Sequence, residues 1–131
     1  MGKIPIIVML VLGAGWIAAC GGPGTSEIST AMTEFAFTPS SSSVSAGSEV
    51  TLTLTNDGTV DHNWVLMDAG YTVTTPFDEA DRAKVFAETS LAAGDSATFT
   101  FTAPSEAGTY QVVCSIPGHL EAGMEASLTV P

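Results

Sequence analysis

Residues 49–55, EVTLTLT, alternate strictly between aliphatic and polar side chains. Val50, Leu52 and Leu54 fall on one face of an extended chain, and the threonines between them fall on the other. This period of two is typical of a β-strand with one face in a core and the other in water. The stretch therefore predicts a sheet protein, and the same pattern should recur along the chain.

The alternation does recur at several further places. Its other segments are EFAF at 34–37, SATFTFT at 96–102, TYQVVC at 109–114 and EASLTV at 125–130. Turn-forming residues separate these segments, for example at 56–58 (NDG) and 93–95 (AGD). Many short strands punctuated in this way predict an all-β fold, an antiparallel β-sandwich or barrel.

One segment, TPFDEADRAKVFAET at 75–89, does not follow this alternation. Thr75 can cap a helix, Pro76 suits its first position, and acidic side chains follow at its positive end. We therefore predict one short helix from about Pro76 to Glu88, carried on a flap between two strands. We expect the flap to cover an edge of the sandwich.

The first twenty residues have the features of an export signal. Lys3 is followed by an uncharged apolar run to Ala19, and small residues precede Cys20. The stretch IAAC followed by GG resembles a bacterial lipobox, in which the cysteine becomes the lipid-modified first residue of the mature protein. A plain signal peptide and an uncleaved anchor are the alternatives.

The composition fits one exported domain. A chain of 131 residues, 45% hydrophobic and 13% charged, has room for a single core. We predict a lipoprotein signal peptide at 1–19, a lipidated Cys20 with a flexible tether at 20–32, and a folded domain at 33–131. Loss of Lys3 leaves two basic residues against fourteen acidic ones, so the net charge falls from −11 to −12. Such acidity argues against nucleic acid as a partner.

The segment CSIPGHLEAGM at 114–124 places a cysteine, a histidine and a methionine at five-residue intervals. The one other histidine of the chain is His62, in VDHNWVLM. If Cys20 is acylated, Cys114 is a single thiol in an exported domain, where burial or a metal must account for it. Two neighbouring strands that meet at one end of a sandwich would bring His62 to Cys114, His119 and Met124.

The chemistry of these four donors selects copper. Two imidazoles, one thiolate and a weak thioether form the donor set of blue copper electron-transfer sites. Structural zinc more often takes four thiolates, or two thiolates and two imidazoles, and catalytic zinc leaves a position open to water. An enzyme would need an open position or a second copper, and no further His or Cys is available to build one. We therefore expect one type 1 copper ion, Cu(II)/Cu(I), and no enzymatic activity.

HNWVL followed by GTYQVVCSIPGHLEAGM resembles the cupredoxins, small blue copper proteins such as plastocyanin and azurin. The likeness covers about residues 32–131. The ligand spacing, the flap and the membrane anchoring are most similar to the auracyanin subfamily of filamentous anoxygenic phototrophs. The resemblance implies a Greek-key, cupredoxin-like sandwich in which His62, Cys114 and His119 form a trigonal plane and Met124 is the axial ligand.

The resemblance also implies roles for residues around the metal. Asn63 matches the family's outer asparagine, with Ser115 as its partner, and such bonds orient ligands. Asp61 stands where azurin has a glycine whose backbone carbonyl makes a weak contact with the metal. The edge of His119 would emerge through an apolar docking patch. The patch would consist of Ile116, Pro117, Gly118, Leu120 and Gly123.

Electron transfer is the function that the resemblance implies. The expected protein is a monomer, lipid-anchored at the periplasmic or extracytoplasmic face of the cell membrane. It would carry single electrons from a quinol-oxidising complex to a photosynthetic reaction-centre cytochrome. Two alternatives stay open: an electron donor to a respiratory terminal oxidase or other copper-dependent enzyme, and a copper-binding or delivery module.

Overall fold

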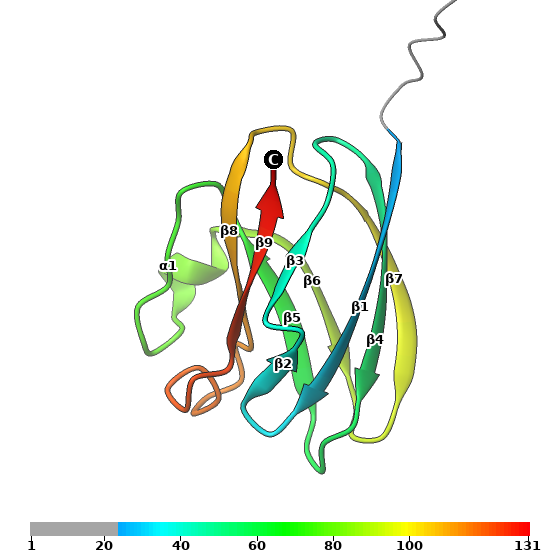
Figure 1. The fold of residues 1–131 in the computed structure, drawn as a ribbon. Helices are drawn as coiled ribbons and strands as arrows, with labels where there is room; N and C mark the ends of the chain where they lie inside the picture. The colour runs from blue at the N-terminus through cyan, green and yellow to red at the C-terminus, as the bar shows by residue number, and fades with distance from the viewer. Residues whose placement is uncertain (1–23) are drawn as a thin grey trace, which may run out of the picture.

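The computed structural model describes residues 24–131, which form two β-sheets packed face to face (Figure 1). The first sheet has the strand order β2-β1-β4-β7, and the second has the order β3-β9-β8-β5-β6. The strands of the first sheet are β1 (Thr25–Thr33), β2 (Ala36–Thr38), β4 (Glu49–Asn56) and β7 (Ser96–Thr102). Those of the second are β3 (Ser41–Ser43), β5 (His62–Met67), β6 (Val85–Leu91), β8 (Gly108–Val113) and β9 (Glu125–Val130). The predicted all-β sandwich is confirmed.

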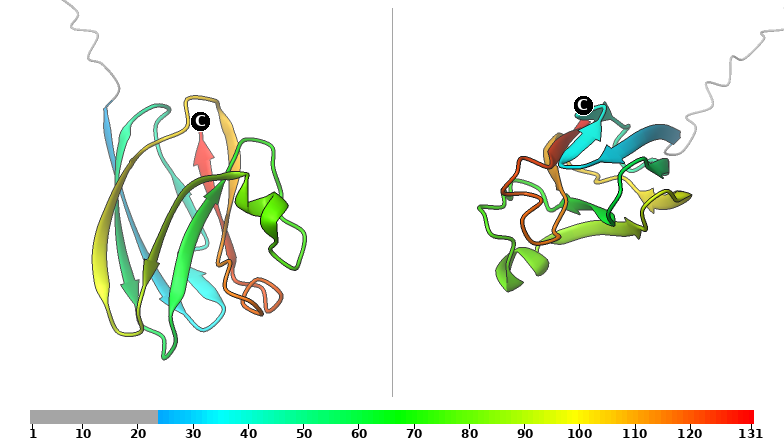
Figure 2. Two further views of the ribbon diagram at one scale, coloured as in Figure 1. Left: turned by 180° about the vertical axis from the view of Figure 1, so that it is seen from behind. Right: turned by 90° about the horizontal axis from the view of Figure 1, so that it is seen from below.

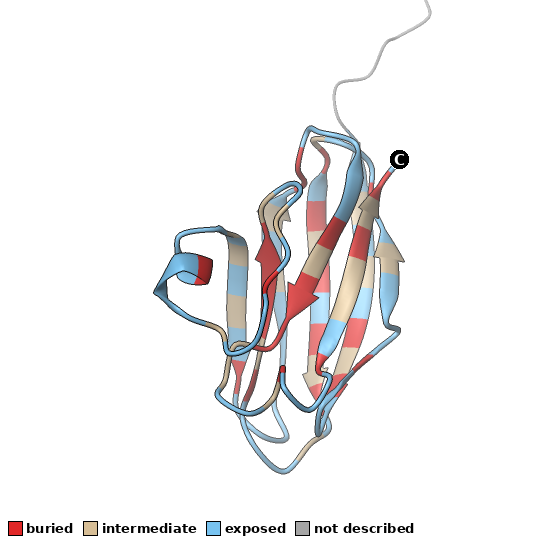
Figure 3. Cartoon of the chain, turned by 90° about the vertical axis from the view of Figure 1, so that its left-hand side faces the viewer, coloured by how far each residue is buried: buried red, intermediate tan, exposed pale blue. Residues whose placement is uncertain are grey.

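The strand β4 shows why the sheets pack together. Val50, Leu52 and Leu54 are fully buried, whereas the threonines between them are exposed or half-buried. Figure 3 shows the same alternation of buried and exposed positions along other strands. The neighbouring β7 places Phe99 and Phe101 beside Leu52 and Val50. Full burial of an aliphatic side chain contributes about 1.5–3 kcal/mol, so the alternation determines which face of the strand turns inward.

Most strand pairs are antiparallel, but two are not. The strand β1 runs parallel to β4, and β3 runs parallel to β9. The sandwich is therefore antiparallel, as predicted, except at these two pairs. Between β1 and β4 the chain crosses to the second sheet as β3 and then returns, so no tight hairpin forces the two strands to run in opposite directions.

The strand β1 begins at Thr25, inside the segment predicted to be a flexible tether. It pairs with β4 as far as Met32, which is fully buried. The predicted boundary between tether and domain at residue 33 is therefore wrong. The inward-facing positions of β1 include Ser26 and Thr30 besides Ile28 and Met32, so the strand carries a weak hydrophobic signal. The predicted signal peptide and lipidated Cys20 lie outside the described residues.

The flap between β5 and β6 holds a shorter helix than predicted. The helix α1 spans only Glu79–Arg82, and its cap is Asp78 rather than Thr75. The carboxylate of Asp78 accepts two N–H bonds from the first turn, and the carboxylate of Asp81 accepts one from Asp78 in return. From Val85 onward half-buried and exposed side chains alternate, and this part of the predicted helix is the strand β6.

Two clusters of buried side chains stabilise the domain. The larger cluster lies between the sheets and includes Trp64 and Leu66 of β5. The smaller cluster includes Val65 and Met67, which alternate with them and so lie on the outer face of β5, under Val73 of the flap. Burial on both faces explains why β5 is apolar almost throughout. The flap therefore covers an outer face of the second sheet, beside which α1 stands (Figure 2), and not simply an edge.

The loops that carry the predicted ligands lie together at one end of the sandwich. In Figure 1 the β1–β2 turn, the β4–β5 loop and the loop before β9 lie at the bottom, whereas β1 begins and the chain ends at the top. Among residues 24–131 no helix is long and apolar enough to cross a membrane.

Candidate metal centre

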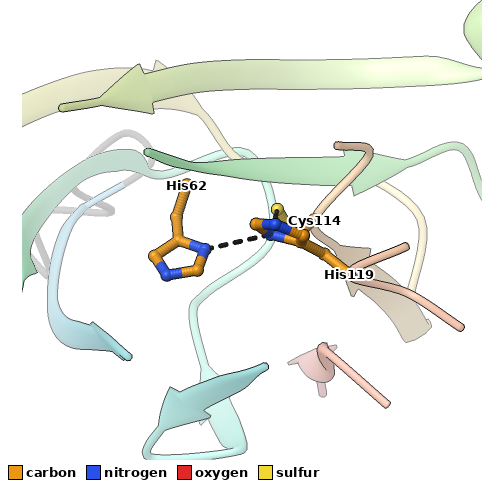
Figure 4. A group of neighbouring side chains, drawn as sticks. All are labelled: His62, Cys114 and His119. Carbon is orange, nitrogen blue, oxygen red and sulfur yellow. Dashed lines mark hydrogen bonds between the residues drawn. The ribbon is translucent and has the colours of Figure 1, made fainter. Parts of the chain in front are cut away.

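Three of the predicted ligands converge at this end of the sandwich. Nδ1 of His62 lies 3.2 Å from Nδ1 of His119, and Sγ of Cys114 lies 3.4 Å from the same His119 nitrogen (Figure 4). One ligand atom from each of the three residues lies within 4.8 Å of the other two. His62 begins β5, Cys114 directly follows β8, and His119 lies in the loop before β9. Three separate segments thus meet at one point.

The loop from Cys114 to Met124 is closed by backbone hydrogen bonds. The N–H of Cys114 donates to the carbonyl of Met124 at 3.2 Å, and the N–H of Met124 donates to the carbonyl of His119 at 3.0 Å. Gly118 and Gly123 have φ angles of 87° and 98°, in the left-handed region that glycine adopts without steric penalty. Met124 is fully buried in the larger cluster. The loop therefore holds its three donor residues in a fixed arrangement.

The protonation chemistry of these residues fits a metal site. Burial, and then the neighbouring His119, lower the pKa of His62 below its ordinary value and so favour the neutral ring that binds metals. Burial raises the pKa of the Cys114 thiol, while the backbone N–H groups of Asn63 and Ile116 act in the opposite direction. A bound metal removes the thiol proton, and thiolate with imidazole is a donor set that suits copper.

Asn63 and Ser115 connect the two segments that carry His62 and Cys114. Nδ2 of Asn63 donates to Oγ of Ser115 at 2.8 Å, and the N–H of Ser115 donates to Oδ1 of Asn63 at 2.7 Å. Each of the two residues directly follows a predicted metal ligand. The paired bonds therefore limit how far His62 and Cys114 can separate.

The other predicted residues at this end differ in exposure. Asp61 is exposed, and its carboxylate accepts a hydrogen bond from the N–H of Ala93 at 3.2 Å. Ile116 is half-buried, and Leu120 is only 7% exposed, because its side chain packs in the smaller cluster under the flap. The prediction of Leu120 as a surface residue is therefore wrong. The exposed members of the predicted patch are Pro117, Gly118 and Gly123.

Phe35 is a neighbour of the site that the sequence pattern misplaced. The segment EFAF predicts Phe35 and Phe37 on one face of a strand, but Phe35 lies in the turn between β1 and β2. Its ring is 44% exposed and stands edge-on to the ring of His119, with centroids 5.3 Å apart. The sequence alone does not distinguish this turn from a strand, because EFAF shows the same alternation of apolar and other residues that a strand would show.

A two-sheet sandwich that gathers two imidazoles, one thiol and a buried methionine at one end defines the type 1 copper proteins. The family model of copper binding proteins of the plastocyanin/azurin family matches residues 25–131, and the chain belongs to this family. The match begins where β1 begins.

Auracyanins are similar to the chain in both sequence and structure. Auracyanin-A of Chloroflexus aurantiacus is 32% identical over 89% of this chain and 90% of its own length. Auracyanin-B of the same bacterium is 35% identical over 81% of this chain and 52% of its own length. The dithionite-reduced auracyanin of Roseiflexus castenholzii has a TM-score of 0.67 at 32% identity, over 81% of this chain and 97% of that one.

These findings confirm the predicted cofactor. His62, Cys114, His119 and Met124 form a type 1 copper site, and the chain is a blue copper electron carrier rather than an enzyme.

Proposed function

We propose that this carrier is anchored by lipid to the extracytoplasmic face of the cell membrane. There it transfers single electrons from a quinol-oxidising complex to the cytochrome of a photosynthetic reaction centre. The auracyanins of known structure come from bacteria described as photosynthetic, which supports this setting. The anchor is a lipidated Cys20 left by cleavage of a signal peptide at 1–19, and the carrier acts as a monomer.

The observation that carries the electron-transfer part of the proposal is the unequal exposure of the four ligands. His62, Cys114 and Met124 are fully buried, whereas His119 is half-buried at the end of the sandwich. Copper bound here would supply a one-electron Cu(II)/Cu(I) couple. The three buried residues exclude water from the centre, and the ring of His119 is the shortest route to a partner's surface.

The surface around His119 receives the partner. Pro117, Gly118 and Gly123 are exposed beside it, and Phe35 adds an apolar ring to this surface. A small apolar surface around the exposed ligand favours docking that is brief enough for turnover. The negative charge of the chain steers it toward basic surfaces.

Two groups next to the ligands adjust the metal centre in this proposal. The hydrogen bonds between Asn63 and Ser115 keep the His62 and Cys114 segments at a constant spacing when the oxidation state changes. The backbone carbonyl of Asp61, the residue directly before His62, would be the group available for a further weak contact with the bound copper.

The test is to mix the copper-loaded protein with purified membrane complexes and follow its blue absorption over time. We expect the quinol-oxidising complex to bleach the colour, and a flash-oxidised reaction-centre cytochrome to restore it. Faster oxidation by a terminal oxidase would instead assign the respiratory role. Transfer of the copper itself to an apo-acceptor, without electron transfer, would identify a delivery module.

A further inference from the structure

The turn that joins β1 to β2, formed by Glu34 and Phe35, lies against the metal centre without providing a ligand. Phe35 is the only non-glycine residue among residues 24–131 with a positive φ, at 64°. An L-residue in this conformation costs about 1–2 kcal/mol. Such strain persists only where the surroundings hold it, and it is concentrated at functional sites. The contacts of the turn show what holds it.

Glu34 binds the turn to the β4–β5 loop. Its Oε1 atom accepts hydrogen bonds from the backbone N–H and from the hydroxyl of Thr59, the latter at 2.9 Å. The backbone bond, and then the side-chain bond, lower the pKa of Glu34 to about 2. The carboxylate is therefore ionised at neutral pH and accepts both bonds. The loop that it binds leads directly into His62.

The same carboxylate oxygen lies on the outer side of the His62 ring. A Cβ atom added to Gly58 would stand 2.9 Å from Oε1 of Glu34, 3.0 Å from Nε2 of His62 and 3.1 Å from Oδ1 of Asn56. Three polar atoms thus surround one point. Nε2 of His62 is buried and has no hydrogen-bond partner within the described chain. With Nδ1 turned to the metal, Nε2 carries the proton, and that proton lies near a negative charge.

Phe35 contacts the other imidazole. Its ring and that of His119 meet at 82° with centroids 5.3 Å apart, the edge-to-face geometry that contributes about 0.5–1.5 kcal/mol beyond the area buried. His119 lies in a loop, so neighbouring strands do not fix its ring. The aromatic contact limits the rotation of that ring about its side-chain bonds.

We propose that the Glu34–Phe35 turn is a positioning element for both imidazole ligands. Phe35 fixes the plane of the His119 ring, while Glu34 holds the loop that leads to His62 and places a carboxylate on the outer side of its ring. Both residues act through the ligands: they keep the rings of His62 and His119 close together whether or not metal is bound. This role rests on the copper site described above and adds two residues to it.

Substitution of Phe35 tests the aromatic contact. Phe35→Ala should lose Cu(II) to a chelator roughly 2- to 10-fold faster than the parent protein, from the energy of the ring contact, and its electron paramagnetic resonance spectrum should change. Phe35→Tyr keeps the ring and should restore both properties. Phe86→Ala is the matched control, because Phe86 is 42% exposed but lies at the end of β6 far from His62. Equal copper loss from Phe35→Ala and Phe86→Ala would overturn the proposal.

Phe35→Gly separates the ring from the strained backbone. Glycine adopts the left-handed conformation freely, so the copper-free variant should melt no lower than Phe35→Ala. It should nevertheless lose copper as fast as Phe35→Ala. Copper retention equal to that of the parent protein would overturn the role of the Phe35 ring. In the copper-free proteins, the His119 ring signals in NMR spectra should shift in Phe35→Ala and stay unchanged in Phe86→Ala.

Glu34→Gln tests the carboxylate. The amide keeps the shape and one acceptor oxygen but removes a negative charge beside His62, so the reduction potential should rise. Glu27→Gln removes the same charge from an exposed position on β1, outside the turn, and is the control. Equal potentials in the two variants would overturn this part of the proposal. A parent protein that takes up no copper would instead contradict the metal site itself, which is a different result.

Discussion

Cys114 is the residue on which the colour of the centre depends. Its sulfur is fully buried and lies 3.4 Å from Nδ1 of His119. Cys114→Ser replaces a soft thiolate by a hydroxyl, so we expect the intense blue absorption to disappear at equal Cu(II) content. Visible spectroscopy measures this, and circular dichroism checks that the sandwich is intact. A folded Cys114→Ser protein that stays blue would contradict thiolate ligation.

Met124 affects the reduction potential rather than the colour. Met124→Leu conserves volume at a fully buried position and should cost less than about 1.5 kcal/mol of stability. We expect the blue colour to remain and the reduction potential to rise, because the thioether no longer donates electron density to the metal. Voltammetry of the two proteins measures the change. An unchanged or lower potential would exclude Met124 as an axial ligand.

Glu34 gives the copper-free domain a defined pH dependence. Its pKa falls from an ordinary value of 4.5 to about 2 on folding, so its contribution is present in full above about pH 4.5 and is lost as the pH falls toward 2. The difference in unfolding free energy between the parent and Glu34→Gln should therefore be constant near neutrality and shrink in acid. Denaturant titrations at low salt measure it, since salt weakens interactions of exposed charges. A difference that grows in acid would reverse the assigned sign.

Predictability from sequence differs among the residues of the site. His62, Cys114 and His119 could be predicted because the chain has so few histidines and cysteines that chemistry limits the choice. Phe35 and Leu120 could not, because the exposure of an apolar side chain depends on tertiary neighbours. Leu120 is buried because the flap offers it apolar partners, and Phe35 is exposed because its turn bends toward His119.

At the scale of elements, the strength of the hydrophobic alternation decides what can be predicted. The strand β4 has three aliphatic inward positions and could be predicted, whereas β1 has hydroxyl side chains at two such positions and could not. The predicted helix was too long because the capping signals in the sequence show only where a helix begins. From Val85 the side chains again alternate between two faces, and this alternation belongs to the strand β6, which pairs with β5.

The stability of the flap should not affect the spectrum of the copper site. Asp78→Ala removes the acceptor of two N–H bonds at the start of α1 and should cost about 1 kcal/mol. We expect faster hydrogen exchange in the flap and a lower melting temperature, with the blue spectrum unchanged. Glu79→Ala, in the same turn but without a capping bond, is the control. A changed spectrum in Asp78→Ala would show that the flap supports the ligands as well as the outer face of β5.

At the scale of the whole molecule, the end of the sandwich at which β1 begins determines how an anchor at Cys20 would orient the metal centre. The chain enters β1 at the end of the sandwich opposite the ligand loops (Figure 1). Residues 21–24 separate Cys20 from β1, and four residues span at most about 14 Å. Strands of eight or nine residues are roughly 25–30 Å long. A domain anchored through Cys20 would therefore present His119 away from the membrane, or would have to lie on its side to reach a partner at the membrane surface.

The same separation would make a lipid anchor at Cys20 independent of the copper site, and this independence is the basis of the last prediction. Cys20→Ser should move the protein from the membrane fraction to the soluble exported fraction, while its blue spectrum and reduction potential stay those of the parent protein. Membrane fractionation and the mass of the native N-terminus measure the anchor, and spectroscopy measures the site.

The three interpretations of the N-terminus give different results in this experiment. An acylated N-terminal cysteine supports the lipoprotein, and a soluble parent protein with an unmodified N-terminus indicates a plain signal peptide. A Cys20→Ser protein that stays in the membrane indicates an uncleaved anchor. Because the metal centre lies at the far end of the sandwich, a change in its spectrum on mutation of Cys20 would contradict the arrangement of the whole molecule.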